Sequence, residues 1–345
     1  MVWISNSQLV AGLSVGVLLT ASGCGGQAAA PAGGDQPLAY VLRVDRMDVA
    51  TTKPGSSESW DDEVAREDPG AGCKVLVAGV SFFEPMLAPA SAICDLSTSP
   101  PRQRHASDPD LQFRLRVGAD AAFSSWVVPD TTSQSEPYQV VVPTEAIPSD
   151  GLQLEALDDD GEAPPELIGS IRVSRDQLMA AYRSPTKLLE LSDGALRRLE
   201  VVVSAYETTS AEQRTTRASD RPTRVGRPAL AGELLSIHAN GSFKVGSWYD
   251  ETLDPAGYPG GEARSYNLKT FESAPHACAI ALIGGEQTFE GVRVGEGFSF
   301  VAKHSGALRV GLNDRDLSNN EGQVTYSVAR GIPTLDQWLA RGRTP

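Results

Sequence analysis

Three carboxylates stand close together between two apolar runs. Asp158 and Asp160 are two positions apart, and Glu166 follows after a glycine and two prolines. Residues i and i+2 of an extended chain point to the same side, and the turn directs Glu166 back towards them. Calcium binds several such oxygen donors, whereas close carboxylates without a cation repel one another. The spacing predicts a calcium loop, with a solvated acidic turn as the alternative.

Short alternating apolar runs surround this loop and predict the strands that position it. Turn residues separate the runs, and one segment, 175–182, has a helical pattern. Many short strands with one apolar face are typical of an antiparallel β-sandwich. The expected strands cover residues 40–49, 74–83, 111–117, 123–128, 138–142, 152–157, 167–173, 187–191 and 196–206.

Two motifs in this region resemble those of the C2 domain, a calcium-dependent phospholipid-binding sandwich. Ser-Asp-Pro at 107–109 precedes an alternating strand, and Asp-x-Asp with a later acid and Leu-Ile-Gly follows at 158–169. The resemblance implies a C2-like sandwich over 38–206. It also implies calcium ligands at Asp108, Asp158, Asp160 and Glu166, with Asp61 or Asp62 upstream.

The region departs from the C2 pattern at informative positions. Asp110 replaces the usual tyrosine, Glu166 replaces the usual aspartate, and an insertion at 63–106 separates the upstream acids from Asp108. The strand rich in lysine and arginine that many lipid-binding members use is missing. Phospholipid binding therefore follows less directly from the resemblance than the fold does.

The second half of the chain is again a series of short strands, expected at 235–239, 243–248, 277–283, 287–292, 297–302, 307–313 and 323–328. Before the last strand stands Asn-Asp at 313–314, then Asn-Asn-x-Gly at 319–322. This pattern resembles the bacterial galactophilic lectins, calcium-dependent galactose-binding sandwiches, over 230–330. The resemblance implies calcium ligands from the side chains of Asp314, Asn319 and Asn320 and the carbonyl oxygen of Arg315.

The implied calcium ligands would leave room for a sugar on the ion. One carboxylate, two amides and one carbonyl leave coordination positions for sugar hydroxyls. The gap between the two motifs is shorter than in the sugar-binding member, and no histidine stands where that lectin contacts sugar. The galactose specificity therefore does not carry over.

The amino terminus resembles a bacterial lipoprotein signal. Residues 1–23 lack charge and end in Ala-Ser-Gly ahead of Cys24, the expected cleavage and lipidation point. A flexible tether of Ala, Gly and Pro at 24–37 follows. An ordinary secretory signal and a transmembrane anchor are the alternatives, although the apolar stretch is short for a stable span.

The other three cysteines, the segment between the two halves and the tail each give a prediction. Cys73 and Cys94 lie within one loop-like region, which favours a disulfide, and Cys278 is expected as a buried thiol. Residues 207–229 are polar and contain several arginines, so we expect a flexible linker there. The tail, 331–345, contains an apolar pattern at helical spacing, which predicts a short helix docked on the last domain.

Charge and motif content limit the function. The net charge of −14 disfavours binding to nucleic acid. The histidines stand in unrelated contexts without HExxH, so we do not expect an enzyme. We expect an all-β protein of two antiparallel sandwiches joined by a linker. Its expected function is calcium-dependent recognition of carbohydrate or phospholipid surfaces, from a lipid anchor in the bacterial cell envelope. The alternative is a structural envelope lipoprotein whose β modules bind proteins without calcium.

Overall fold

A computed structural model describes residues 36–53, 55, 60, 108–118, 121–134, 137–161, 164–246, 249, 251–284 and 288–342. The predictions for the signal, the tether up to residue 35, the insertion and the upstream acids Asp61 and Asp62 lie outside these residues. The same holds for lipidation at Cys24 and for the disulfide between Cys73 and Cys94. Within the described part of the chain, no helix has the length and apolar character needed to cross a membrane.

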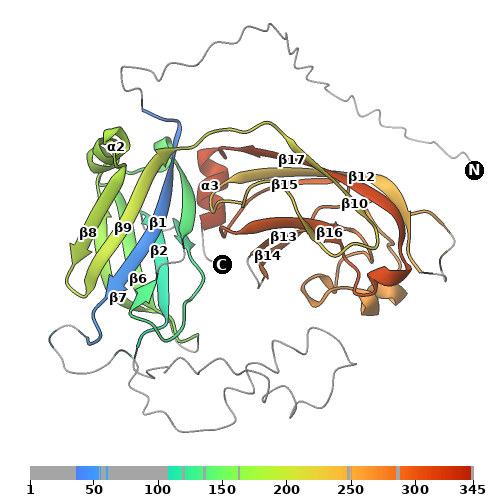
Figure 1. Ribbon diagram of the computed structural model, residues 1–345, viewed down its shortest axis with the longest axis horizontal. Coiled ribbons are helices and arrows are strands. Elements are labelled where there is room, and N and C mark those ends of the chain that lie inside the picture. The colour runs from blue at the N-terminus through green and yellow to red at the C-terminus, as the bar shows by residue number, and fades with distance from the viewer. Residues whose placement is uncertain are drawn as a thin grey trace, which may run out of the picture. The chain divides into compact units, whose positions relative to one another are not determined.

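The first half forms two antiparallel sheets, as Figure 1 shows. One has the order β4-β1-β9-β8, with β5 also paired to β1, and the other has the order β3-β2-β6-β7. The strands of the first sheet are β1 (Ala39–Val49), β4 (Ser133–Gln134), β5 (Tyr138–Pro143), β8 (Leu188–Asp193) and β9 (Leu196–Ala205). Those of the second are β2 (Leu111–Val117), β3 (Ala121–Ser124), β6 (Leu152–Asp158) and β7 (Glu166–Val173).

Strand β2 shows why the sequence folds in this way. Leu111, Phe113, Leu115 and Val117 are buried, and the residues between them are half-buried. Their side chains join Leu42 and Val203 of the facing sheet in one apolar core. Period-two patterning therefore predicts the strand, and burial of its apolar face holds the two sheets together.

Helix α2 (Arg175–Arg183) confirms the predicted helix. The Ser174 hydroxyl accepts a hydrogen bond from the Gln177 amide at 3.2 Å, and the Gln177 side chain accepts one from the Ser174 amide at 2.8 Å. This capping box satisfies two of the donors that a helix start leaves without partners. The short helix η2 (Thr144–Ala146) follows β5.

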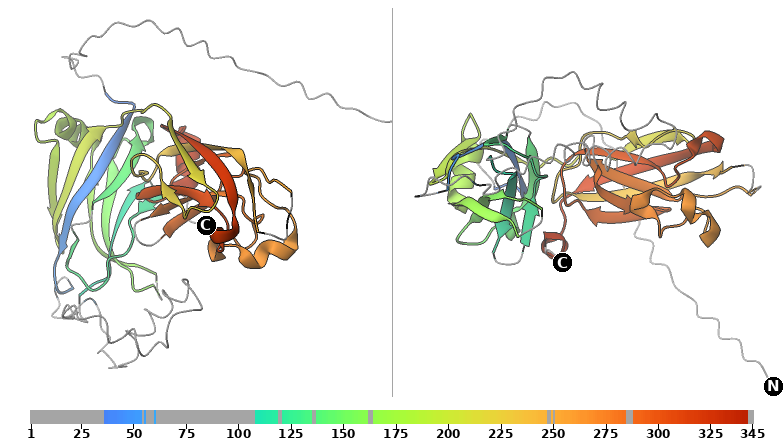
Figure 2. Two further views of the ribbon diagram at one scale, coloured as in Figure 1. Left: turned by 45° about the vertical axis from the view of Figure 1, so that its right-hand side comes forward. Right: turned by 90° about the horizontal axis from the view of Figure 1, so that it is seen from below.

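The second half is also a sandwich of two antiparallel sheets, in the orders β10-β17-β12-β15 and β11-β16-β13-β14. Figure 2 shows the two layers from two further directions. The first sheet contains β10 (Glu212–Arg217), β12 (Leu234–Lys244), β15 (Gly297–Val301) and β17 (Glu321–Gly331). The second contains β11 (Thr223–Arg224), β13 (Ala279–Gly284), β14 (Thr288–Arg293) and β16 (Ala307–Leu312). The all-β class with two sandwiches is thus confirmed.

Short helical turns connect these strands. Helices η3 (Gly261–Tyr266) and η4 (Lys269–Phe271) lie between β12 and β13, and η5 (Leu317–Asn319) lies between β16 and β17. Cys278 is fully buried and carries a free thiol, as predicted, and burial raises its pKa to about 11.

The prediction of a flexible linker at 207–229 is wrong for the residues that form β10 and β11. Strand β10 pairs with β17 over all six of its residues, and Thr216 is buried between the two sheets. The backbone of an edge strand bonds its neighbour whatever its side chains, so polar residues such as Thr215 and Arg217 do not prevent pairing. Residues 212–217 do not alternate between apolar and polar side chains, so the sequence pattern does not predict the strand.

The tail docks on the last domain, as predicted, and on the first sandwich as well. Helix α3 (Leu335–Gly342) forms as expected, but Trp338 belongs to the core of the first sandwich. Its ring lies 4.6 Å from that of Phe123, between centroids. Arg341 reaches the second sandwich, where Nε donates to the Val301 carbonyl at 2.8 Å. The tail therefore contacts both sandwiches, which belong to one compact unit.

Candidate cation-binding sites

The first candidate site lies where β6 ends. Asp158 is the last residue of β6, and its register partner is Leu111 at the start of β2. Its side chain is only 2% exposed, and Oδ1 accepts a hydrogen bond from the Asp110 amide at 2.8 Å. A strand end thus holds a carboxylate in a buried position at the mouth of the sandwich.

The pKa of Asp158 is raised by burial and by neighbouring carboxylates. Burial raises the pKa of Asp158 to about 6, and the hydrogen bond from Asp110 opposes this rise. The negative charges of Asp160, Asp110 and Glu166 raise the pKa further. The structure therefore brings three of the predicted ligands, Asp158, Asp160 and Glu166, within electrostatic range of one another.

Asp110 belongs to the same group, although it was not predicted as a ligand. It is half-buried, and its Oδ1 accepts a hydrogen bond from the Asp130 amide at 2.8 Å. Burial raises the pKa of Asp110, and the charges of Asp130, Asp160 and Asp159 raise it further. A signal for Asp110 existed, because it directly precedes a strand that pairs with β6. Asp130 had none, since it lies in a distant turn.

The other predicted ligands are less closely engaged. Asp160 and Glu166 are exposed, and Lys53 Nζ lies 3.2 Å from Glu166 Oε2. Asp108 is half-buried, and the hydrogen bond to Asp158 from this segment comes from the backbone amide of Asp110. Among the described residues, no three His, Cys, Asp or Glu side chains converge closely enough to enclose a metal.

The second candidate site lies between β16 and β17. Asp314 is 4% exposed; its Oδ1 accepts from the Asp316 amide at 2.9 Å, and its Oδ2 accepts from Asn320 Nδ2 at 3.0 Å. Asn320 is 5% exposed, and its Oδ1 is buried without a hydrogen-bond partner. A buried acceptor without a donor is costly, so this oxygen is the unsatisfied feature of the site.

His276 lies beside this pair, although no histidine was predicted here. Its Nε2 lies 3.8 Å from Asp314 Oδ2, and its Nδ1 bonds Asn267 Oδ1 at 3.0 Å. Because Asn267 Nδ2 donates to the Ala274 carbonyl at 2.8 Å, Oδ1 must accept from His276 Nδ1. The neutral ring therefore directs the lone pair of Nε2 towards the carboxylate.

Burial sets the charge states of His276 and Asp314. It lowers the pKa of His276 and raises that of Asp314. Each group partly opposes the shift of the other, and the hydrogen bond from Asn320 lowers the pKa of Asp314. The buried pair thus concentrates oxygen and nitrogen lone pairs with little access to water.

Asn313 fixes the surroundings of the site. Its Oδ1 accepts from the Leu268 amide at 3.0 Å, and its Nδ2 donates to the carbonyls of Phe271 and Pro275, both at 3.2 Å. These bonds hold the segment that carries η4 against the end of β16. Asn313 is therefore a positioning residue.

The remaining predicted ligands lie differently. The Arg315 amide donates to the Tyr266 carbonyl at 2.8 Å, and its guanidinium donates to the Ser265 carbonyl. Asn319 is exposed, with Nδ2 3.5 Å from Asp316 Oδ2. The structure thus brings Asp314 and Asn320 together, whereas Asn319 is turned towards Asp316.

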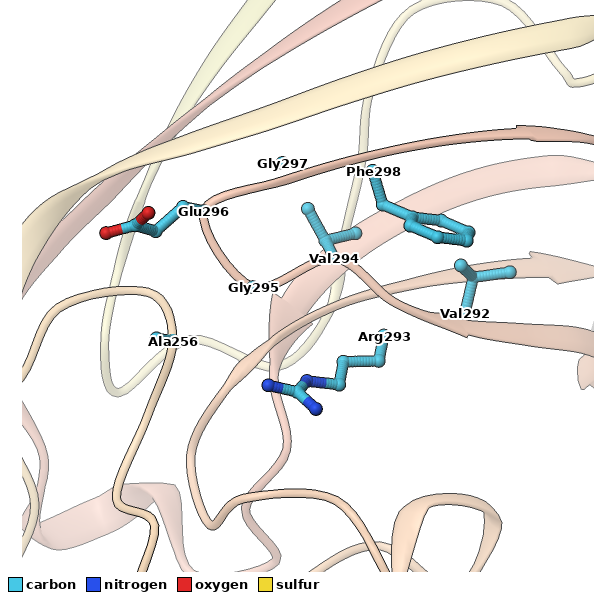
Figure 3. Close-up of a pocket in the computed structure, with 8 residues that line it drawn as sticks. All are labelled: Ala256, Val292, Arg293, Val294, Gly295, Glu296, Gly297 and Phe298. Carbon is cyan, nitrogen blue, oxygen red and sulfur yellow. The ribbon is translucent and has the colours of Figure 1, made fainter. Parts of the chain in front are cut away.

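Two hollows lie elsewhere on the second sandwich. One, of about 570 Å³, is formed around the turn between β14 and β15. Figure 3 shows Phe298 beside Val292 and Val294, with Arg293 and Glu296 directed away from it. The other, of about 510 Å³, crosses β10, β17 and β12, and its lining carries hydroxyl, amide and imidazole groups. Its lining residues are Gln213, His238, Asn240, Gly241, Ser242, Gln323, Thr325 and Ser327.

Comparisons with known proteins give only distant similarities. No family model and no curated protein matches the chain. Among solved structures, the N-terminal domain of EclA, a PllA-like lectin, is similar at 22% identity. That match covers 35% of this chain and 96% of the lectin, at a TM-score of 0.28.

The calcium-bound tandem C2 domains of extended synaptotagmin 2 are similar at 11% identity, covering 87% and 99% of the two chains at a TM-score of 0.27. Human GIVD cytosolic phospholipase A2 is similar at 11% identity, covering 87% of this chain but 31% of the enzyme, at a TM-score of 0.28. Such scores do not establish a shared arrangement over the aligned lengths.

Proposed function

We propose that this protein is a calcium-dependent carbohydrate-recognition protein of the bacterial cell envelope, with its sugar site at the end of β16. The observation that carries this proposal is the buried Asn320 Oδ1, which has no partner although Asn320 Nδ2 lies 3.0 Å from the Asp314 carboxylate. A cation would use both groups, because calcium prefers carboxylate and amide oxygens.

The chemistry of these donors supports calcium in particular. Rotation of the Asn320 amide would place its oxygen where its nitrogen now lies, beside Asp314 Oδ2. Two oxygens in that position repel each other unless a cation binds both. Asp314 is the one charged ligand in this proposed set, so the bound ion keeps a positive charge and open positions for sugar hydroxyls.

The acidic end of the first sandwich provides a second, weaker calcium site in this proposal. Asp158, Asp110 and Asp160 supply the oxygens. Burial raises the pKa values of Asp158 and Asp110, and the charges of neighbouring carboxylates raise them further. The affinity expected for such an extracellular module is on the order of 10⁻⁴ to 10⁻³ M. Glycan rather than phospholipid is favoured, since the nearby exposed acids Asp160 and Glu166 repel anionic lipid.

The test uses the full chain without its leader. Binding to a glycan array should require calcium and should be lost in Asp314→Asn, which removes the charge of the site. Asp316→Asn is the matched control, because it removes the same charge from the same loop and asparagine can still cap η5. Calcium-independent binding, or equal loss in both variants, contradicts the sugar site.

The alternative, a structural lipoprotein that binds proteins without calcium, makes a different forecast. It expects no array signal and no effect of calcium on the melting temperature. The lipid anchor is tested separately, since Cys24→Ala should release the protein from the membrane fraction of expressing cells. An unchanged membrane fraction in that variant would contradict lipidation at Cys24.

A further inference from the structure

Two arginines of the second sandwich lie directly opposite each other on neighbouring strands. Arg224 of β11 is the register partner of Arg309 of β16. Opposite residues of an antiparallel pair project from the same face. Leu308 and Val310 point into the core, so both arginines project from the outer face of this sheet. Like charges in this position repel each other unless an anion lies between them.

The guanidinium of Arg309 has donors without acceptors. Its Nε and Nη2 atoms are buried, and neither has a hydrogen-bond partner. The residues around it on this face are Leu282, opposite on β13, and Ala307 and Gly311 along β16. None of these three has a side-chain acceptor. The structure therefore buries two charged N–H groups and leaves them unsatisfied, which is unfavourable without a ligand.

One acid close to this segment, Glu212, already contacts another arginine. The carboxylate of Glu212 lies against Gly226, two residues after Arg224. Its Oε2, however, is 3.4 Å from both Nε and Nη2 of Arg330, a buried arginine. Glu212 is thus committed to another cation.

We propose that Arg309 and Arg224 form a binding site for an oxyanion, namely a phosphate, sulfate or carboxylate group. Nε and Nη2 occupy one edge of the guanidinium, and two parallel N–H groups on one edge bind two oxygens of such a group at once. Arg224 is exposed on a two-residue strand at the edge of the sheet, so an anion meets it first. This site is independent of calcium and of the proposed sugar loop.

The experiment follows the arginine Nε–H signals of the full chain by NMR during titration with sodium phosphate, sodium sulfate or sodium acetate. Sodium chloride keeps the ionic strength constant and is the reference anion. The Arg309 signal should shift saturably with at least one oxyanion, and the three arms distinguish tetrahedral from planar groups. Arg309→Gln should weaken binding by about tenfold or more, and Arg224→Gln by a smaller factor.

Two further variants keep the result interpretable. Arg214→Gln, on the exposed edge strand β10, removes the same charge elsewhere and should leave binding unchanged. Arg309→Lys keeps the charge but loses the two parallel N–H groups of the guanidinium. Because the proposed binding depends on this pair of donors, Arg309→Lys should bind the oxyanion as weakly as Arg309→Gln does. A wild-type titration without saturation, or equal weakening by Arg214→Gln, would overturn the proposal.

Discussion

The indole Nε1 of Trp338 donates a hydrogen bond of 2.8 Å to the carbonyl oxygen of Val141, 197 residues earlier in the chain. Gly232 makes room for this contact, because a Cβ at that position would lie 2.6 Å from the indole nitrogen and 2.4 Å from the Val141 oxygen. Ala231, its neighbour, donates to the Gln139 carbonyl at 3.1 Å and accepts from the Val141 amide at 2.7 Å. Two distant segments, one at 231–232 and one at Trp338, thus meet at β5.

Trp338→Ala should therefore destabilise the first sandwich although it alters the tail. A fully buried tryptophan replaced by alanine typically costs about 3–5 kcal/mol. Trp338→Phe keeps most of the apolar contact and loses the hydrogen bond to Val141, so its cost should be smaller, on the order of 1–3 kcal/mol. Urea unfolding measures both. Gln337→Ala is the control, because it loses the bond that the Gln337 side chain accepts from the Thr334 amide at the start of α3 but removes no buried group. An effect of Trp338→Ala no larger than that of the control would contradict the docking of α3.

Asp158→Asn should remove a pH dependence of stability. In the wild type without calcium, the raised pKa means that the folded state keeps a proton on Asp158 that the unfolded state loses between about pH 4 and 6. The proton on Asp158 therefore adds to the free energy of unfolding in full below about pH 4, and this gain is lost as the pH rises to about 6. Asparagine can still accept from the Asp110 amide and carries no charge, so the fall should flatten. The variant should be more stable at pH 7 by on the order of 1 kcal/mol.

Calcium should reverse the order of stability between the wild type and Asp158→Asn at pH 7. In the wild type the ion binds the ionised carboxylate and raises the melting temperature at pH 7. The Asp158→Asn variant should lose this gain, so that the more stable protein in chelator becomes the less stable one in about 10 mM calcium. Thermal unfolding in both buffers measures the crossing. A flat pH profile in the wild type would show that Asp158 titrates normally.

Glu233→Gln should be among the most destabilising single changes in the chain. Glu233 is fully buried, accepts from the Tyr206 hydroxyl at 2.8 Å and from Arg330 Nη1 at 3.1 Å, and forms an ion pair with Arg227. Its charge compensates Arg330, whose side chain is also fully buried. Removing one partner of a buried ion pair costs about 3–5 kcal/mol.

Glu212→Gln is the matched control for this prediction. Glu212 is partly exposed and lies 3.4 Å from Arg330, so water can replace much of its contribution. The expected cost is about 1 kcal/mol or less. Equal costs in the two variants, measured by urea unfolding, would contradict the central role of Glu233 in this cluster.

The sequence predicts these elements unevenly, for physical reasons. Strand β2 alternates between apolar and polar residues over its full length, so its bounds and its buried face follow from the pattern. Strand β10 has no such pattern, because its contribution is backbone pairing. Motif spacing places Asp158 with Asp160 and Asp314 with Asn320. Motif spacing does not predict that Asp130 and His276 lie at these sites, because both are placed there by turns whose paths depend on tertiary packing.

The pairing of β10 with β17 determines where the polypeptide can be divided for study. A fragment that begins at residue 230 includes the sugar loop but omits β10, and this would uncover one edge of β17 along six residue pairs. Exposed edges invite strands from other molecules, so such a fragment is expected to self-associate. It would also lack β11 and hence Arg224, leaving Arg309 alone on its face. A recombinant half that begins before Glu212 keeps this edge protected and is the appropriate sample for separate study of the second sandwich.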